Sequence, residues 1–298
     1  MCLRGACGGL GLVFCVDRSL GSPFAKQNPD GILQELISSG CLKIYVKEIN
    51  NLVATTEEER EGLRRANRAT AKLLQDLAKL ARPGVTTGDL NDYAMDYIAQ
   101  LGATPVFATE EGFPGCINTS VNDVAVHGVP GKQKLKIGDV LSIDAGMLLD
   151  GYAGDSTITV AIGKINPKHQ RLIEIAREAM MAGIQAARPG KRIGDIGYAI
   201  QKVAWSHGYD VVREYIGHGL GHVMHERPDV PNVGRAGTGP VMPEGLVITI
   251  EPTLVEKSAR MRVDADGWSV RTRDGGWAAQ FEHTVIVSQQ GAEILSTL

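Results

Sequence analysis

The chain repeats part of its own sequence, and this internal repeat limits the folds that it can adopt. Residues 81–89 read ARPGVTTGD, and residues 187–195, 106 positions later, read ARPGKRIGD. Gly102 matches Gly208 at the same spacing. This spacing is longer than the roughly 20–50 residues of a solenoid repeat. We therefore expect two related halves packed against each other, not a stack of short units.

Each half is predicted to begin with two helices. Threonines and glutamates at residues 55–59 are typical of a helix start, and apolar residues at helical spacing continue the pattern to residue 81. Proline and glycine then end this helix, and a second helix is predicted over residues 87–100. In the second half, the corresponding helices are predicted over residues 168–187 and from residue 194.

Two pairs of predicted strands follow the same repeat. Residues 138–144 (GDVLSID) align with residues 245–251 (GLVITIE), and each segment ends in a carboxylate. Residues 155–160 (DSTITV) align with residues 282–287 (EHTVIV), and each segment begins with one. A pseudo-twofold α+β domain fits this order, with helices outside and a curved, mainly antiparallel sheet inside. The equivalent carboxylates would then converge near the axis.

A glycine-rich segment with three of the seven histidines lies in the second half. Residues 215–228 read YIGHGLGHVMHERP. Glycine allows the backbone to approach a ligand closely, and histidine is the commonest metal ligand among side chains. This segment therefore indicates a binding site, and its histidines need carboxylate partners from elsewhere in the chain.

Four carboxylates and one histidine are the candidate metal ligands. Buried acids cannot all stay ionised at one place without cations. Oxygen ligands with one imidazole suit Mn²⁺, Fe²⁺, Co²⁺ or Zn²⁺, and two such ions would balance roughly four negative charges. Taken singly, each residue could instead be a turn former, a solvated strand end or a hydrogen-bonded loop histidine. Their equivalent positions in the repeat favour a two-metal site formed by Asp144, Asp155, His218, Glu251 and Glu282.

Composition excludes several classes of protein. The net charge of −3 does not indicate nucleic acid or a membrane surface as a partner, and no apolar run reaches the roughly 18–20 residues of a membrane span. The five cysteines are odd in number and match no zinc spacing. We expect a reducing, cytoplasmic setting.

Residues 1–44 differ from the rest of the chain, because they mix Gly, Ser, Cys and Pro without periodicity. We expect a poorly ordered N-terminal extension there and a catalytic domain over residues 45–298. A transit peptide, a mis-set start codon and zinc binding by the N-terminal cysteines are the alternatives for this extension.

Several motifs together resemble the methionine aminopeptidases of the first type, within the pita-bread fold that Xaa-Pro aminopeptidases and creatinase share. The resemblance covers about residues 45–298. Its motifs are NDVAVHGVP, SID, GDST, GHGLGHVMHERP, TIEP and QFEHT, at residues 122–130, 142–144, 154–157, 217–228, 249–252 and 280–284.

The resemblance implies removal of the initiator methionine from nascent proteins when the second residue is small, with two ions of Co, Mn, Fe or Zn as cofactors. Asp155 and Glu282 would bridge the ions, and Asp144 would chelate one of them. His218 and Glu251 would hold the other, with Glu251 also moving a proton. A water between the ions would attack the carbonyl that follows the methionine.

The resemblance also assigns roles to the remaining histidines. His225 would hydrogen-bond the carbonyl oxygen, and His127 would contact the nitrogen of the scissile amide, although packing or loop hydrogen bonding is the alternative for both. His222 and His283 are interpreted as supporting or structural residues, with His283 on the face of its strand opposite Glu282.

A methionine substrate needs an apolar pocket. The resemblance places Phe113, Met224 and Trp268 in it, although the two aromatic residues could also be ordinary core residues. Three positions depart from the family pattern: Met224 replaces an aromatic residue, Glu110 a tyrosine, and Asn118 a small residue that is often cysteine. These departures concern the shape of the pocket and not the metal ligands.

The expected partners are the N-termini of nascent polypeptides at the ribosome, with no nucleic-acid specificity and no membrane, and the chain is expected to be a monomer. Xaa-Pro aminopeptidases usually carry a larger folded N-terminal domain. The second type of methionine aminopeptidase has an insertion for which the spacing of 31 positions from Glu251 to Glu282 leaves no room. A binding protein that has lost catalysis is a further alternative, but such relatives lose ligands.

Overall fold

The computed structural model describes residues 2–7, 10–15, 53–54, 56–110 and 112–298. The chain divides into two units, Met1–Glu48 and Ile49–Leu298. In the first unit, strands β1 (Cys2–Cys7) and β2 (Leu10–Cys15) pair in antiparallel register, in a segment whose sequence shows no strand periodicity. The predicted boundary at residues 44 and 45, Cys41, and the side chains of the other N-terminal cysteines lie outside the described residues.

The predicted helices are confirmed. They are α2 (Glu57–Leu80) and α3 (Thr87–Gln100) in the first half, and α5 (Pro167–Ala186) and α6 (Ile193–Ser206) in the second. Thr56 and Thr86 cap α2 and α3 in reciprocal capping boxes. A short helix, α4 (Val106–Glu110), was not predicted. No helix in the described part of the chain is long and apolar enough to cross a membrane.

One nine-stranded sheet holds the two halves together. Its main order is β10-β9-β11-β16-β7-β6-β3, with β4 also paired to β6 and β17 to β16, and all its pairs are antiparallel. Its strands are β3 (Thr104–Pro105), β4 (Ile117–Val121), β6 (Val140–Leu149), β7 (Tyr152–Ala161), β9 (Gly217–Gly219), β10 (Glu226–Val230), β11 (Val247–Ile250), β16 (Glu282–Ile286) and β17 (Glu293–Ile294).

The described part of the second unit also contains two three-stranded sheets. One has the order β15-β12-β8 and the other β13-β14-β5. Their strands are β5 (Val124–Val126), β8 (Asp210–Val211), β12 (Thr253–Val255), β13 (Met261–Val263), β14 (Val270–Thr272) and β15 (Ala278–Gln280).

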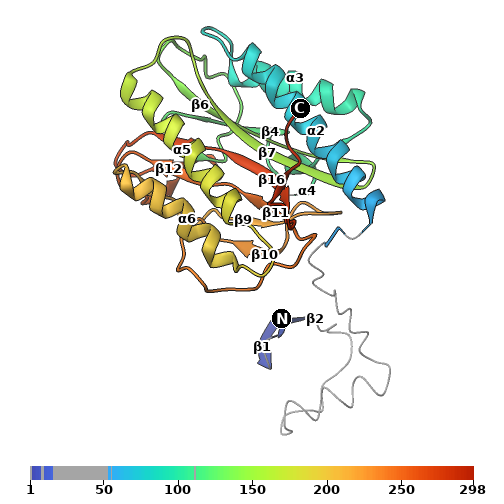
Figure 1. The fold of residues 1–298 in the computed structure, drawn as a ribbon. Helices are drawn as coiled ribbons and strands as arrows, with labels where there is room; N and C mark the ends of the chain where they lie inside the picture. The colour runs from blue at the N-terminus through green and yellow to red at the C-terminus, as the bar shows by residue number, and fades with distance from the viewer. Residues whose placement is uncertain (1, 8–9, 16–52, 55, 111) are drawn as a thin grey trace, which may run out of the picture. The chain divides into compact units, whose positions relative to one another are not determined.

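The centre of the large sheet has the pseudo-twofold symmetry that the repeat predicts. The equivalent strands β7 and β16 lie side by side, with Glu282 opposite Thr157, and the equivalent strands β6 and β11 flank them. Figure 1 shows the helices of both halves outside these strands. The expected α+β architecture with a mainly antiparallel sheet is therefore confirmed.

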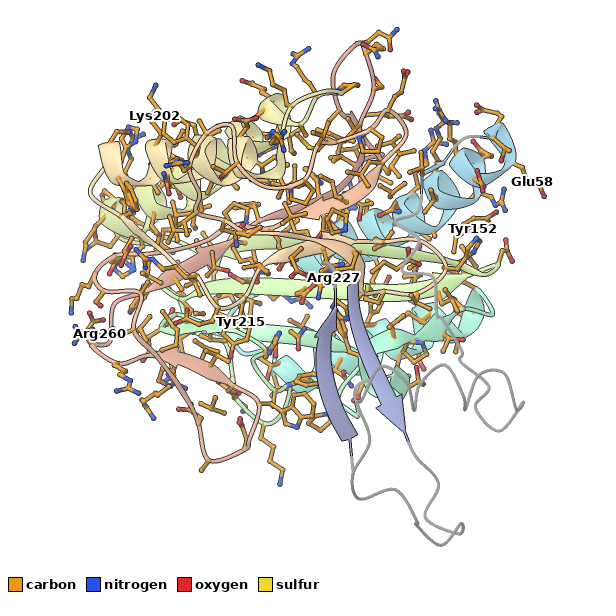
Figure 2. The ribbon with its side chains drawn as sticks, turned by 90° about the horizontal axis from the view of Figure 1, so that it is seen from below. Glu58, Tyr152, Lys202, Tyr215, Arg227 and Arg260 are labelled. Atoms are coloured by element: carbon orange, nitrogen blue, oxygen red, sulfur yellow. The ribbon has the colours of Figure 1, made fainter. Side chains whose placement is uncertain are left out.

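Alternation along the strands separates an apolar face from a polar one. On β6, Leu141, Ile143 and Ala145 pack in the core formed with α2 and α3, so Asp144 faces the other way. On β11, Ile248 and Ile250 pack in the core formed with α5 and α6, so Thr249 faces the other way. In Figure 2, Lys202 on the exposed face of α6 lies at the periphery, away from the strands.

Candidate metal centre

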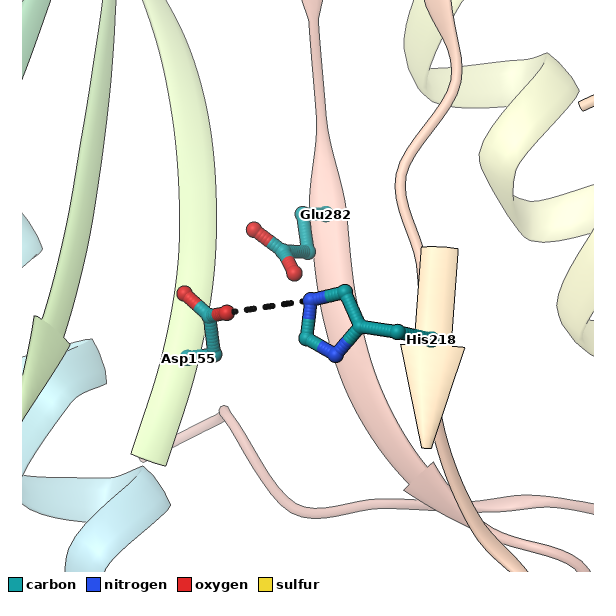
Figure 3. Close-up of side chains that lie close together, drawn as sticks. All are labelled: Asp155, His218 and Glu282. Carbon is teal, nitrogen blue, oxygen red and sulfur yellow. Dashed lines mark ion pairs between the residues drawn. The ribbon is translucent and has the colours of Figure 1, made fainter. Parts of the chain in front are cut away.

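Three predicted ligands from three strands converge at the centre of the sheet. Asp155 on β7, Glu282 at the start of β16 and His218 on β9 each offer one ligand atom, and these atoms lie within 4.8 Å of one another. All three residues are buried. Figure 3 shows the side chains reaching into one space from β7, β16 and β9. This convergence is what equivalent carboxylates near a pseudo-twofold axis predict.

Glu251 and Asp144 lie beside this group. The Nε2 atom of His218 is 3.6 Å from Oε1 of Glu251 and 3.6 Å from Oδ2 of Asp155. Asp144 lies close enough for its charge to raise the pKa of both Glu251 and Glu282. The register pairs Asp144 with Thr157 and Asp155 with Gly146, so the two aspartates lie diagonally on one face of the β6–β7 hairpin. All five predicted ligands are therefore brought to one region.

The carboxylates lie so close together that their negative charges repel one another. Burial and the charge of Asp144 raise the pKa of Glu251 to about 8. Burial, followed by the charges of Asp155 and Glu251, raises the pKa of Glu282 well above its ordinary value. The Oε1 atom of Glu282 is buried and has no hydrogen-bond partner among the described residues. A hard divalent cation would relieve both the repulsion and the missing contact.

The His218 ring has the protonation state and the orientation of a neutral metal ligand. Burial lowers its pKa to about 3, with a further contribution from His225. The Nδ1 atom lies 2.9 Å from the carbonyl oxygen of Gly219, so the proton belongs on Nδ1 and the lone pair on Nε2. Because this ring is uncharged at pH 7, its 3.6 Å separations from the carboxylates are not ion pairs, and they are too long for hydrogen bonds. Such separations are expected between atoms that bind the same cation.

Glycines allow the histidine strand to lie between its neighbours. A Cβ atom on Gly217 would stand 2.5 Å from the carbonyl oxygen of Thr249, and one on Gly219 would stand 2.0 Å from that of Arg227. Only glycine therefore fits where β9 passes between β11 and β10. The His218 amide also donates to the Thr249 hydroxyl at 3.0 Å, which fixes the position of the imidazole.

Several residues that hold the carboxylates were not predicted. The Thr157 hydroxyl donates to Oε2 of Glu282 at 2.8 Å, and the Thr249 hydroxyl donates to Oε1 of Glu251 at 3.0 Å. The Oδ1 atom of Asn67, on α2, accepts from the Asp155 amide at 3.3 Å. A buried asparagine on the apolar face of a predicted helix was the available signal for Asn67.

The two histidines predicted to contact substrate lie at the edge of the centre. The rings of His225 and His218 are 4.3 Å apart, and the His225 side chain is exposed. Burial, with a smaller effect of His225, lowers the pKa of His127 to about 4. His127 has a left-handed backbone, with φ of 56°, which is uncommon for a residue other than glycine. Its ring packs edge-on against Tyr215 at 5.0 Å, a contact that was not predicted.

The three predicted pocket residues belong to one apolar cluster. Phe113 and Trp268 meet edge-to-face, with ring centroids 5.4 Å apart, and Met224 is fully buried in the same cluster. The Met224 methyl group covers Gly146, where a Cβ atom would stand 2.3 Å from it. Since Gly146 pairs with Asp155, this cluster adjoins the carboxylates. The side chain of Glu110 lies outside the described residues.

The remaining histidines in these motifs have structural contacts. His222 Nδ1 lies 2.8 Å from the carbonyl oxygen of Gly151, and its ring packs on that of Tyr152 at a tilt of 41°. His283 Nδ1 lies 2.8 Å from the Ser296 hydroxyl. His283 shares its strand face with Val285, which packs in the core formed with α5 and α6, so its predicted orientation is confirmed.

A buried set of carboxylates around one neutral imidazole, at the symmetry centre of this fold, indicates a metal-dependent enzyme, and divalent ions held by such donors activate water for hydrolysis. The sequence matches metallopeptidase family M24 over residues 61–289, and the chain belongs to that family.

The chain matches individual relatives over nearly their full length. The chain is 41% identical over 246 residues to the methionine aminopeptidase of Clostridium acetobutylicum, covering 82% of this chain and 98% of that protein. The crystal structure of methionine aminopeptidase from Rickettsia prowazekii has a TM-score of 0.80 and 42% identity, covering 81% of this chain and 98% of that chain. The crystal structure of methionine aminopeptidase from Thermotoga maritima has a TM-score of 0.81 and 36% identity, covering 84% of this chain and 100% of that chain.

Proposed function

We propose that this chain is a methionine aminopeptidase that removes the initiator methionine from proteins whose second residue is small. The convergence of Asp155, His218 and Glu282 within 4.8 Å carries this proposal. Membership of family M24 and about 40% identity to methionine aminopeptidases over nearly their whole length support it.

Two divalent ions fit the donor set. In this proposal Asp155 and Glu282 would be shared by both ions, because these two carboxylates occupy equivalent positions in the repeat. Asp144 would hold one ion, whereas His218 and Glu251 would hold the other, consistent with the 3.6 Å between His218 Nε2 and Glu251 Oε1. Divalent ions bound in such a site acidify a water molecule and polarise a carbonyl group. Co, Mn, Fe and Zn all suit these donors.

Other roles in the proposed reaction belong to side chains at and around the metal centre. Glu251 exchanges a proton at its carboxylate, and its Oε1 atom, 3.6 Å from Nε2 of His218, places that carboxylate at the proposed centre. His225 donates a hydrogen bond to the substrate carbonyl oxygen as charge develops there, and His127 contacts the amide nitrogen that becomes the leaving group. Phe113, Met224 and Trp268 bind the methionine side chain, because a thioether packs well against aromatic rings.

The proposed substrates are the N-termini of nascent polypeptides, which places the activity in the cytoplasm beside the ribosome. In this proposal residues 45–298 form the catalytic domain and act as a monomer. The proposed chemistry needs neither nucleic-acid specificity nor a membrane.

A peptide assay tests the proposed activity. Purified protein supplied with Mn²⁺ or Co²⁺ is expected to release free methionine from a Met-Ala-Ser peptide, as measured by mass spectrometry. Release from Xaa-Pro peptides in place of Met-Ala-Ser would contradict the proposal, as would the absence of activity with any divalent metal.

The methionine pocket gives a prediction of its own. Trp268→Ala is expected to raise KM for methionyl peptides, by about tenfold, more than it lowers kcat, because a pocket wall mainly supplies uniform binding. Steady-state kinetics on Met-Ala-Ser measures both constants. Trp205→Ala is the matched control, since Trp205 is half exposed on α6. An unchanged KM in Trp268→Ala would remove Trp268 from the pocket.

A further inference from the structure

Asn118 contacts a proposed metal ligand directly. It lies on β4, where the register pairs it with Asp144 on β6, and its side chain is almost fully buried. Its Nδ2 atom donates a hydrogen bond to Oδ2 of Asp144 at 2.7 Å. Directly paired residues on antiparallel strands point to the same face, so Asn118 lies beside the carboxylates as part of the same surface.

This contact is suited to fixing the orientation of Asp144. Asp155 and Glu282 are deeply buried, at 4% and 3% exposure, and Glu282 also accepts a hydrogen bond from Thr157. Asp144 is only partly buried, so the bond from Asn118 restricts a side chain that its surroundings enclose less. An amide donates along fixed directions, and its bond to an ionised carboxylate is charge-assisted.

We propose that Asn118 is a positioning residue that orients Asp144 and thereby sets the affinity for the cation that Asp144 holds, without changing the affinity at His218 and Glu251. The inference rests on the two-metal centre of the proposed function. Hydrogen-bond partners of metal ligands typically contribute about 10- to 100-fold to metal affinity. Here we expect the affinity for only one of the two ions to change.

Calorimetric titration of the metal-free full chain with Mn²⁺ tests this inference. Two binding events are expected in the wild type, and Asp144→Asn identifies the event that belongs to Asp144 by removing it. In Asn118→Leu, which keeps the branched outline of the side chain but loses the donor, that same event is expected to weaken by about 10- to 100-fold. The other event should stay within about twofold. Thr119→Val is the control, because Thr119 alternates to the opposite face of β4.

A second measurement separates positioning from a general loss of structure. The electron paramagnetic resonance spectrum of Mn²⁺ should show a coupled pair in the wild type and an isolated ion in Asn118→Leu at the same Mn²⁺ concentration. Asn118→Ala serves in the same way if the leucine variant does not fold. Equal weakening of both events, or no weakening, would overturn the inference. A single binding event in the wild type would also overturn it, whereas the Met-Ala-Ser assay would still decide the proposed activity.

Discussion

An Asp155→Asn protein is expected to fold normally but to lose turnover of Met-Ala-Ser by about 10³-fold or more. Asp155 is one of the two proposed bridging ligands, and its buried carboxylate lies 3.6 Å from Nε2 of His218. Replacing a carboxylate oxygen with an amide keeps the shape but removes one negative charge from between the ions. A loss of 10³ corresponds to about 4 kcal/mol of transition-state stabilisation, within what a metal centre contributes.

Metal content must be measured together with the rate. Elemental analysis of the purified Asp155→Asn protein shows whether ions are lost or only misplaced, and circular dichroism reports whether the fold is kept. Asp92→Asn is the matched control, because Asp92 is exposed on α3 and should leave the rate unchanged. Wild-type kcat with full metal content in Asp155→Asn would contradict the role of Asp155 as a bridging ligand.

The elements that create the site were predictable because their signals are local and occur twice. Apolar periodicity gave the four long helices, and the aligned segments 138–144 and 245–251 gave β6 and β11 with their carboxylates. The repeat then predicted that equivalent carboxylates converge near the axis, and the pairing of β7 with β16, with Glu282 opposite Thr157, is how the structure achieves this. This symmetry placed Asp155 and Glu282 together before any contact was known.

The residues that hold the ligands were not predictable in the same way, because their roles depend on which backbone lies opposite. Asn67 lies 88 positions before Asp155 in the sequence and reaches it only because α2 crosses β7. Asn118 was recognisable as a departure from the family, but its bond to Asp144 follows from the register of β4 on β6. The edge-on contact of Tyr215 with His127 likewise needs the fold.

Removing the metal is expected to make the free energy of unfolding fall as the pH rises from about 6.5 to 8. Burial and Asp144 raise the pKa of Glu251 from 4.5 to about 8, and the pKa of Glu282 is also raised. A carboxyl group that holds its proton more tightly in the folded state stabilises the protein fully below pH 4.5. That stabilisation is lost as the pH rises through the folded-state pKa.

Because of the histidines, the fall in the free energy of unfolding is clearest above pH 6.5. Burial lowers the pKa of His218 to about 3 and that of His127 to about 4. Protonation in the unfolded state therefore opposes folding below pH 6.5 and offsets the carboxyl groups there. Between pH 6.5 and 8 the carboxyl groups act alone, and Glu251 contributes roughly 2 kcal/mol at about 1.4 kcal/mol per pH unit.

Urea unfolding of the chelator-treated protein at several pH values between 6.5 and 8 measures this loss, and the same series with Mn²⁺ is the comparison. The loaded protein should not lose stability over this range, because its carboxylates bind the cation in ionised form and metal affinity rises as protons leave. Glu251→Gln removes one titrating group and should flatten the metal-free profile. A metal-free wild type whose stability is constant or rises from pH 6.5 to 8 would contradict the strained carboxylate cluster on which the proposed metal centre depends.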